Sequence, residues 1–303
     1  MATYNHEKYI RQAIESFLNQ KTDFKMRLII GEDFSTDNTA EIVKEYASRF
    51  PDKIAPLINN RNMGMTDNSV QILNACHAPY FAMLEGDDFW TDPLKLQKQV
   101  DFLEANPDYG LVHTDVNFYY QESNRMIKDF NKTNDIKFPN GNIFEDLLTN
   151  LDLFIKTATV LARTEIYKNA YSPDLIKEKH WIASDLPTML EISLKTKIKY
   201  FNYSTATYRL LEESASRTHD QRKKLNFHKA NWDVRLYYWE KYSRDPECKK
   251  VIDKYFIRSI LSDAYKMRDW DLVKKTKKDF IENKIKMNFK DWVKFILVYF
   301  DHQ

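Results

Sequence analysis

The residues best suited to chemistry are the carboxylates of Glu85-Gly86-Asp87-Asp88, which follow a short apolar run from Tyr80 to Leu84. That run is long enough for a buried strand and too short for a helix. In open α/β sheets, ligands bind beyond the carboxyl ends of the strands, where this turn would lie. Adjacent carboxylates repel each other and call for a positive partner, commonly a divalent cation shared with phosphate oxygens. For the turn taken alone, a solvated acidic loop is the simpler interpretation.

The carboxylate of Asp33 favours a functional site over a solvated loop. Asp33 follows a second short apolar run, Met26 to Ile30, and so also lies just past a predicted strand. Because the carboxyl ends of parallel strands meet at one edge of a sheet, we expect Asp33, Asp87 and Asp88 to converge. Three acidic residues at one edge favour a binding site over a solvated turn.

The elements that must position these carboxylates alternate between helix and strand up to residue 117. The apolar periodicity predicts helices over residues 6–20, 39–50, 65–75 and from 93, and strands over 26–30, 53–58, 80–84 and 109–116. Such alternation is typical of an α/β fold, a Rossmann-like and mostly parallel sheet with helices on both faces.

The pattern loosens after Asn117. We expect a short helix over residues 141–150, a helix beginning at Ser184 or Asp185, and strands over 157–161, 197–201 and 204–208. From about residue 225 the chain reads as helical, rich in Trp, Tyr and Lys. The predicted organisation is an α/β domain, residues 1–220, followed by a helical extension, residues 221–303.

Charge is nearly balanced over the 303 residues, at +2, but it is unevenly distributed. The segment Lys249 to Lys294 holds 14 Lys or Arg against 7 Asp or Glu, a local net charge of +7. A basic tail beside a mildly acidic body suggests a membrane surface or another anionic partner, and a solvated helical face explains it equally well. Cys76 and Cys248 have neither metal-ligand nor redox spacing, so no disulfide is expected.

No signal peptide or membrane-spanning run is visible in the sequence. The segment Phe289 to Phe300 is apolar and aromatic but is interrupted by Lys290, Asp291 and Lys294, so at most it lies on a membrane. We therefore expect a cytoplasmic protein, with peripheral contact at the inner face of the plasma membrane through its basic C-terminal helices.

Four motifs, in the right order, resemble those of family 2 glycosyltransferases with the GT-A fold. They are the opening segment Ala2–His6, the loop Glu32–Asp37, the turn Glu85–Asp88 and the pair Ser184-Asp185. Tyr208-Arg209, followed by Ser214 and Ser216, is similar to the loop that closes over the donor in that family. The resemblance covers roughly residues 1 to 220 and is closest to bacterial enzymes that build capsule, O-antigen or other surface polysaccharides.

The resemblance implies a nucleotide-sugar donor, UDP- or dTDP-linked, and a saccharide or lipid-linked acceptor. Ala2 and Tyr4 would belong to the nucleotide-binding segment. Asp33 would accept an N–H of the base, and Asp87 would bind the ribose side of the nucleotide. Arg209 would screen the diphosphate, although a structural pair explains it equally well.

The resemblance also implies the chemistry. Asp88 would ligate Mn²⁺ or Mg²⁺ bridging the diphosphate, whose developing charge the metal stabilises. Asp185 would take the proton of the acceptor hydroxyl as it attacks the anomeric carbon from the opposite face, which inverts the anomeric configuration. From its position alone, Asp185 is simply a helix cap.

The chain departs from the family pattern in three places. The strand that usually precedes Tyr-Asn is almost absent, so the first strand is expected to be truncated, with an open position in the sheet. Phe34 stands where glycine is commoner, which requires a permissive backbone or a different turn. Gln221-Arg222-Lys223-Lys224 is not the Gln-x-x-Arg-Trp of processive synthases, which favours the addition of one sugar.

Two other classes remain as alternatives. A nucleotidyltransferase would need a glycine-rich phosphate loop near the start, and Met1 to Lys21 contains no glycine. A non-catalytic module would bind a membrane or partner through the basic aromatic tail alone. No feature indicates nucleic-acid binding.

Several other side chains have a structural and a functional interpretation. His113 fits a core histidine better than a site residue, and His180 and His219 fit surface positions better than metal ligands. Trp181 fits core packing and acceptor stacking equally well. The aromatic residues of the extension are expected to pack its helices, with a membrane-facing belt as the alternative.

Overall fold

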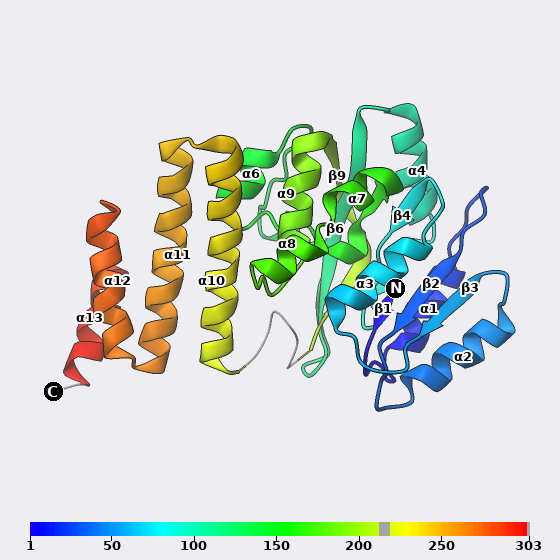
Figure 1. Ribbon diagram of the computed structural model, residues 1–303, viewed down its shortest axis with the longest axis horizontal. Helices are drawn as coiled ribbons and strands as arrows, with labels where there is room; N and C mark the ends of the chain where they lie inside the picture. The colour runs from blue at the N-terminus through cyan, green and yellow to red at the C-terminus, as the bar shows by residue number, and fades with distance from the viewer. Residues whose placement is uncertain (212–218, 302–303) are drawn as a thin grey trace. The chain divides into compact units, whose positions relative to one another are not determined.

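The computed structural model describes residues 1–211 and 219–301 (Figure 1). Its chain forms two compact units, which we describe separately. The sheet unit comprises Met1–Ile143, Asp152–Leu175 and Pro187–Leu210, and the helical unit comprises Phe144–Leu151, Ile176–Leu186 and Leu211–Gln303.

The first sheet of the sheet unit is fully parallel, as the alternation of helix and strand predicts. It contains β1 (Ala2–Thr3), β2 (Leu28–Glu32) and β3 (Ile54–Ile58), in that spatial order. The intervening helices are α1 (Ile10–Leu18), α2 (Thr39–Arg49) and α3 (Met65–Ala75). Each lies within a residue or a few residues of its predicted bounds.

The strand β1 has two residues, as its short apolar run implies, yet it joins two parts of the unit. Ala2 pairs with Gly31 of β2 on one side and forms an isolated parallel bridge with Glu85 on the other. The Gly86 N–H donates to the Ala2 carbonyl at 3.0 Å. The carboxyl ends of β1 and β2 therefore meet the acidic turn at one edge.

The second sheet is mixed, which strand–helix alternation does not predict. Its order is β4 (Tyr80–Ala82), β8 (Leu161–Arg163), β6 (Tyr109–Tyr120), β9 (Lys197–Leu210) and β5 (Phe89–Trp90), with β7 (Arg125–Ile127) paired to β6. Among the strand pairs of this sheet in residues 1–211, β6 and β9 alone run parallel. The predicted strand over 157–161 is wrong in its bounds, because Thr157–Thr159 forms a 3₁₀ turn before β8. The two strands predicted between 197 and 208 are one long strand, β9.

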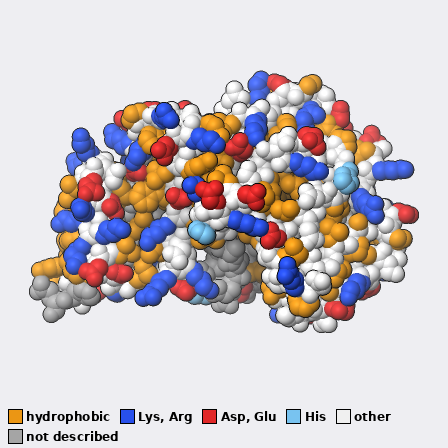
Figure 2. Space-filling view, in the orientation of Figure 1, with side chains coloured by type: hydrophobic (Ala, Val, Ile, Leu, Met, Phe, Trp, Pro, Cys, Tyr) orange, Lys and Arg blue, Asp and Glu red, His pale blue; other side chains and the backbone are white. Residues whose placement is uncertain are grey.

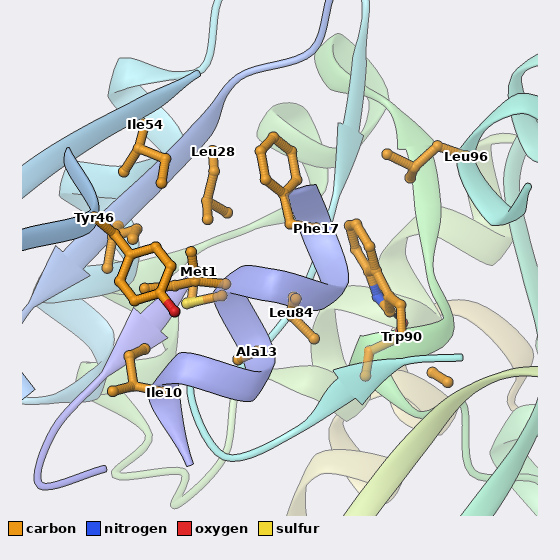
Figure 3. Close-up of a cluster of buried hydrophobic side chains, with 14 of the residues drawn as sticks. Met1, Ile10, Ala13, Phe17, Leu28, Tyr46, Ile54, Leu84, Trp90 and Leu96 are labelled. Atoms are coloured by element: carbon orange, nitrogen blue, oxygen red, sulfur yellow. The ribbon is translucent and has the colours of Figure 1, made fainter. Parts of the chain in front are cut away.

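A continuous apolar core joins α1 to both sheets (Figure 3). Ile10, Ala13 and Phe17 recur at helical spacing on α1 and are buried, as the periodicity predicts. Figure 3 shows Phe17 between Leu28 of β2 and Trp90 of β5. This core fixes the strands whose ends carry the candidate site.

The remaining helices divide between the two units, with residues 144–151 in the helical unit. They are α4 (Lys95–Ala105), α5 (Phe130–Thr133), α6 (Phe144–Thr149), α7 (Thr164–Ala170), α8 (Pro173–Glu178) and α9 (Asp185–Lys195). Helix α4 begins two residues later than its Asp-Pro signal predicts, although the Asp92 carboxylate still accepts the Leu94 N–H at 2.9 Å.

The helical unit ends in four successive helices, which confirms the helical reading of the last 80 or so residues. These are α10 (Gln221–Tyr238), α11 (Pro246–Met267), α12 (Trp270–Glu282) and α13 (Phe289–Phe300), with a π-helical turn over Trp239–Ser243 (Figure 1). Each of the four starts at a side chain that accepts backbone N–H groups, the cap expected of Asp and Asn. No helix in the described ranges is long and apolar enough to span a bilayer.

Trp181 shows how this unit is packed. The indole is buried, lies against the rings of Tyr237 and Tyr238, and donates to the Asp233 carboxylate at 2.7 Å. Of its two interpretations, the structure supports core packing.

Candidate active site

The acidic turn follows β4 and is pressed against the opening segment of the chain. A Cβ on Gly86 would lie 2.5 Å from the Thr3 Oγ1 and 2.7 Å from the His6 Nδ1. Real Cβ atoms do not approach so closely, so glycine is what lets the turn meet β1. The His6 Nε2 in turn lies 3.9 Å from the Asp87 Oδ2. The turn is therefore fixed by contact, not left in solvent.

The two adjacent aspartates of the turn have different environments. The Asp87 side chain is about one-fifth exposed, whereas Asp88 is buried. The Asp88 Oδ1 accepts the Arg209 N–H at 2.7 Å. Its Oδ2 is buried and, among the residues the structure describes, has no hydrogen-bond partner. An orphan carboxylate oxygen of this kind is costly unless a ligand completes it.

Electrostatics agree with that geometry. Burial, followed by the nearby Asp87 and Glu85 carboxylates, raises the pKa of Asp88 well above its usual value. The Arg209 N–H and Lys156 act in the opposite direction. A carboxylate in this setting binds a cation or takes up a proton.

Arg209, a residue of β9, holds the acidic turn Glu85–Asp88 in place. Its Nε donates to the Asp87 carbonyl at 2.8 Å, and its terminal nitrogens donate to Gln12 and Gln121. The guanidinium also lies over three aromatic rings: Tyr9, Phe89 and Tyr119. Because the side chain is 94% buried and held on all these sides, its geometry suits a residue that positions the turn.

Lys156 is a cation near the site that sequence analysis missed. Its ammonium lies 4.2 Å from the ring centroid of Tyr208, the residue before Arg209, and 4.4 Å from that of Phe154. It is close enough to Asp88 to lower the pKa of that carboxyl. No motif marks Lys156, since the 3₁₀ turn that follows it brings it to this place.

Asp33 lies at the end of β2, as predicted, and fixes the loop that follows β3. Its carboxylate accepts the Met63 N–H at 2.8 Å, the Gly64 N–H at 2.9 Å and the Asn59 amide at 3.0 Å. The next residue, Phe34, has φ 61°, which confirms that this position needs a permissive backbone. The Phe34 side chain is half exposed at the sheet edge.

The opening segment is joined to the loop before α2 by side-chain bonds. The Asn5 Oδ1 accepts the Thr36 N–H at 2.8 Å, and the Asp37 Oδ2 accepts the Glu7 N–H at 3.0 Å. Partial burial acts to raise the pKa of Asp37, but hydrogen bonds donated by Thr39 and Glu7 outweigh it, so the pKa is lowered overall. Tyr4 projects from this segment with 43% of its surface exposed. Ala2, by contrast, uses its backbone to pair with both neighbours.

The structure thus brings Ala2, Asp33, Asp87, Asp88 and Arg209 to one edge of the sheet unit. Asp185 is the first residue of α9 and belongs to the helical unit, so its proposed role rests on its motif. Ser214 and Ser216 lie outside the described residues.

These histidines lie where the sequence predicts, His113 in the core and His180 and His219 at the surface. His113 is buried against Phe138 and Tyr200, and burial lowers its pKa to about 3. His180 and His219 are exposed. Cys76 and Cys248 are both free thiols, as expected.

The residues at this edge fit a shared metal ion better than a closed metal centre. Within the described ranges, no three His, Cys, Asp or Glu side chains gather into a set that could hold a metal alone. Mg²⁺ in nucleotide sites is usually held by one or two carboxylates, with phosphate oxygens and water completing its shell, and Mn²⁺ favours the same oxygen ligands. Asp88, with its orphan Oδ2, and Asp87 beside it supply that donor set.

Comparison with solved structures confirms the GT-A fold. Staphylococcus aureus TarS, residues 1–349 in complex with UDP-GlcNAc, superposes with a TM-score of 0.59 at 14% identity, over 98% of this chain and 77% of that one. The mannosyltransferase PcManGT from Pyrobaculum calidifontis, in complex with GDP-Man and Mn²⁺, has a TM-score of 0.56 at 13% identity, over 96% of this chain and 76% of that one.

Some sequence relatives are more similar to the chain than these solved structures, over about half of its length. Uncharacterized proteins of Mycobacterium tuberculosis and Mycobacterium bovis are 37% identical over 166 residues, which cover 54% of this chain. Those residues are 45% of the relatives' length, so the chain spans about half of them. A Bacillus subtilis protein named as the teichuronic acid biosynthesis glycosyltransferase TuaG is 26% identical over 242 residues, covering 76% of this chain and 89% of its own.

The model of the family described as glycosyl transferase family 2 matches residues 1–163, which is more than half of the chain. That span includes β1, the Asp33 loop, the acidic turn and Lys156. The chain belongs to glycosyl transferase family 2.

Proposed function

We propose that this protein transfers one sugar from a UDP- or dTDP-linked donor to a hydroxyl of a saccharide or lipid-linked acceptor, with inversion, in surface polysaccharide synthesis. The observation that carries the proposal is the buried Asp88 beside the partly exposed Asp87: no group in the part of the chain that the structure describes donates a hydrogen bond to the Asp88 Oδ2. Family membership, the name of TuaG, and the nucleotide sugars bound to TarS and PcManGT support it.

The donor nucleotide would lie along the sheet edge. Asp33 would accept an N–H of the base through the carboxylate that already fixes the 59–64 loop, and Tyr4 offers an exposed ring beside it. Asp87 would bind the ribose side. Arg209 positions the turn through its buried bonds, and Lys156 supplies a positive charge for the diphosphate on the side of Tyr208.

Asp88, with Asp87, would hold Mn²⁺ or Mg²⁺ in this site. When bound, the cation supplies charge stabilisation for the departing nucleoside diphosphate. The backbone N–H of Arg209 donates to Oδ1, so Oδ2 would be the oxygen left for the cation. The match to PcManGT, whose structure contains Mn²⁺, supports a divalent cation.

Asp185 would act as the general base. The acceptor hydroxyl oxygen would form a bond to the anomeric carbon, and the hydroxyl proton would pass to the Asp185 carboxylate. In the same step the bond between the anomeric carbon and the diphosphate oxygen would break. Attack opposite the leaving group inverts the configuration in one displacement. A carboxylate is a weak base in water, so the transfer must be concerted with bond formation. A lipid-linked acceptor would place this reaction at the cytoplasmic face of the membrane.

The test measures release of UDP or dTDP from a panel of nucleotide sugars with saccharide acceptors and Mn²⁺. Asp88→Asn and Asp185→Asn should each lower turnover about 10²- to 10³-fold. Asp88→Asn should also lose donor binding, whereas Asp185→Asn should keep it. The exposed Asp135→Asn serves as the matched control. Wild-type turnover by Asp88→Asn would refute the proposal.

A further inference from the structure

The last helix presents an apolar face to solvent. Six large side chains of α13 are between 39% and 82% exposed: Phe289, Trp292, Ile296, Leu297, Tyr299 and Phe300. At 100° per residue, positions 289, 292, 296 and 300 lie on one side of a helix. We call these six residues the outer face of α13. Figure 2 shows hydrophobic side chains among Lys and Arg near the C-terminal end of the helical unit.

The outer face meets the rest of the unit at its margins, where Tyr299 lies 5.4 Å from Trp270 and Trp292 lies 6.2 Å from Phe295, ring centroid to ring centroid. The opposite side of α13 already packs inward through the fully buried Val298, and Phe295 lies 5.2 Å from Trp270, ring centroid to ring centroid. Asn288 and Asp291 form a capping box that starts the helix. A core helix of a water-exposed domain is polar on its outer side, so this second apolar face calls for another environment.

The charges around the outer face are cationic. Both acidic groups of this region are engaged: the Asp291 Oδ2 lies 3.1 Å from the Arg258 Nε, and the Asp301 Oδ2 lies 2.6 Å from the Arg268 Nη1. Lys277, Lys290 and Lys294 border the face, and within the described residues none of them forms an ion pair. The ammonium of Lys277 lies 5.6 Å from the ring centroid of Trp292.

We propose that α13 docks on an anionic lipid surface, with its outer face at the boundary between headgroups and acyl chains and its lysines on the phosphates. An apolar face with aromatic residues and a lysine border is the composition of a helix that lies in this interface. A helix of 12 residues is about 18 Å long, too short to cross a bilayer. Two copies meeting through this face would bring their lysine borders together, which disfavours self-association.

This docking is independent of sugar transfer. Binding of the full chain would be measured by sedimentation with vesicles of phosphatidylcholine alone or mixed with phosphatidylglycerol. We expect binding to the anionic vesicles only. Phe289→Ser with Phe300→Ser should weaken it about tenfold per phenylalanine removed. Lys290→Gln with Lys294→Gln should weaken it about fivefold per lysine. Asp88→Asn should bind as wild type.

Met126→Ser, at an exposed apolar residue of β7, is the matched control and should bind as wild type. Circular dichroism and thermal unfolding of each variant show that the fold is kept. Unchanged vesicle binding by the double Phe→Ser variant would overturn the proposal. The proposal would also be overturned if the wild type bound neither kind of vesicle and instead formed a dimer, measured by light scattering, that is lost in the double Phe→Ser variant.

Discussion

The sheet unit and the helical unit depart from the usual distribution of side chains in opposite directions. In the sheet unit, the ionisable residues Asp33, Asp88 and Arg209 are buried at the sheet edge. In the helical unit, the outer face of α13 is apolar and exposed. Buried charge is retained where partners or ligands complete it, and exposed apolar surface where another surface covers it. The comparison thus sets the proposed nucleotide site against the proposed docking surface.

The largest effect on the sheet-edge side should come from Arg209→Met. It removes a buried cation that joins Gln12, Gln121 and the Asp87 carbonyl, and so should cost about 3–5 kcal/mol in urea unfolding and abolish nucleotide binding. Arg209→Lys should not rescue binding, because one ammonium cannot make this set of bonds. Full rescue by lysine would show that charge alone matters.

Gly86→Ala probes the contact between the acidic turn and β1. The new Cβ would meet Thr3 and His6 at under 3 Å, so the variant should lose about 1–3 kcal/mol of stability and bind nucleotide more weakly. Thr3→Ala introduced into the Gly86→Ala background should recover part of both losses, since it removes the Thr3 Oγ1. Additive losses in this double-mutant cycle would mean that the close approach is not the cause.

Lys95→Met tests whether a buried charge outside the candidate site lowers the stability of the sheet unit. Burial lowers the pKa of Lys95 to about 7, although its ammonium donates to Gln99 at 2.7 Å and faces Trp90. Between pH 7 and about 10, Lys95 is therefore protonated in the unfolded chain but largely deprotonated in the folded one. The free energy of unfolding of the wild type should rise with pH through that window, by up to about 1.4 kcal/mol per pH unit. Lys95→Met should lack this contribution to the slope. Identical pH profiles would contradict a buried, depressed lysine.

The smallest stability effect should come from Phe289→Ser on the outer face of α13. Because this side chain is 82% exposed, the free energy of unfolding should change by no more than about 0.5 kcal/mol. Vesicle binding should fall in the same variant. A large loss of stability would mean that the face belongs to the core, which would remove the contrast between the two units.

The sheet-edge carboxylates could be predicted because strand ends and turn residues are local signals. Asp33 and Asp88 follow short apolar runs, and the strain at Phe34 follows from a bulky residue where glycine is usual. The burial of Arg209 could not be predicted, since arginine is normally exposed and its partners lie 88 or more residues away along the chain.

Other features depend on tertiary contacts that no local pattern encodes. Lys156 reaches the site through a 3₁₀ turn read from the sequence as a strand, which misplaced β8 by a few residues. For the apolar segment that forms α13, the sequence leaves helix packing and membrane contact both open, because a helix that is apolar on most sides resembles a core helix until exposure is known.

The central claim is that Asp88 completes a nucleotide site with a divalent cation. Thermal shift with UDP, dTDP, GDP and ADP, each with and without Mn²⁺, tests it most directly on wild type and Asp88→Asn. A ligand at a hundredfold its dissociation constant adds about 2.7 kcal/mol, a shift of a few degrees. We predict a shift for UDP or dTDP that requires both Mn²⁺ and Asp88. An equal shift in Asp88→Asn, or none with any nucleotide, would contradict the claim.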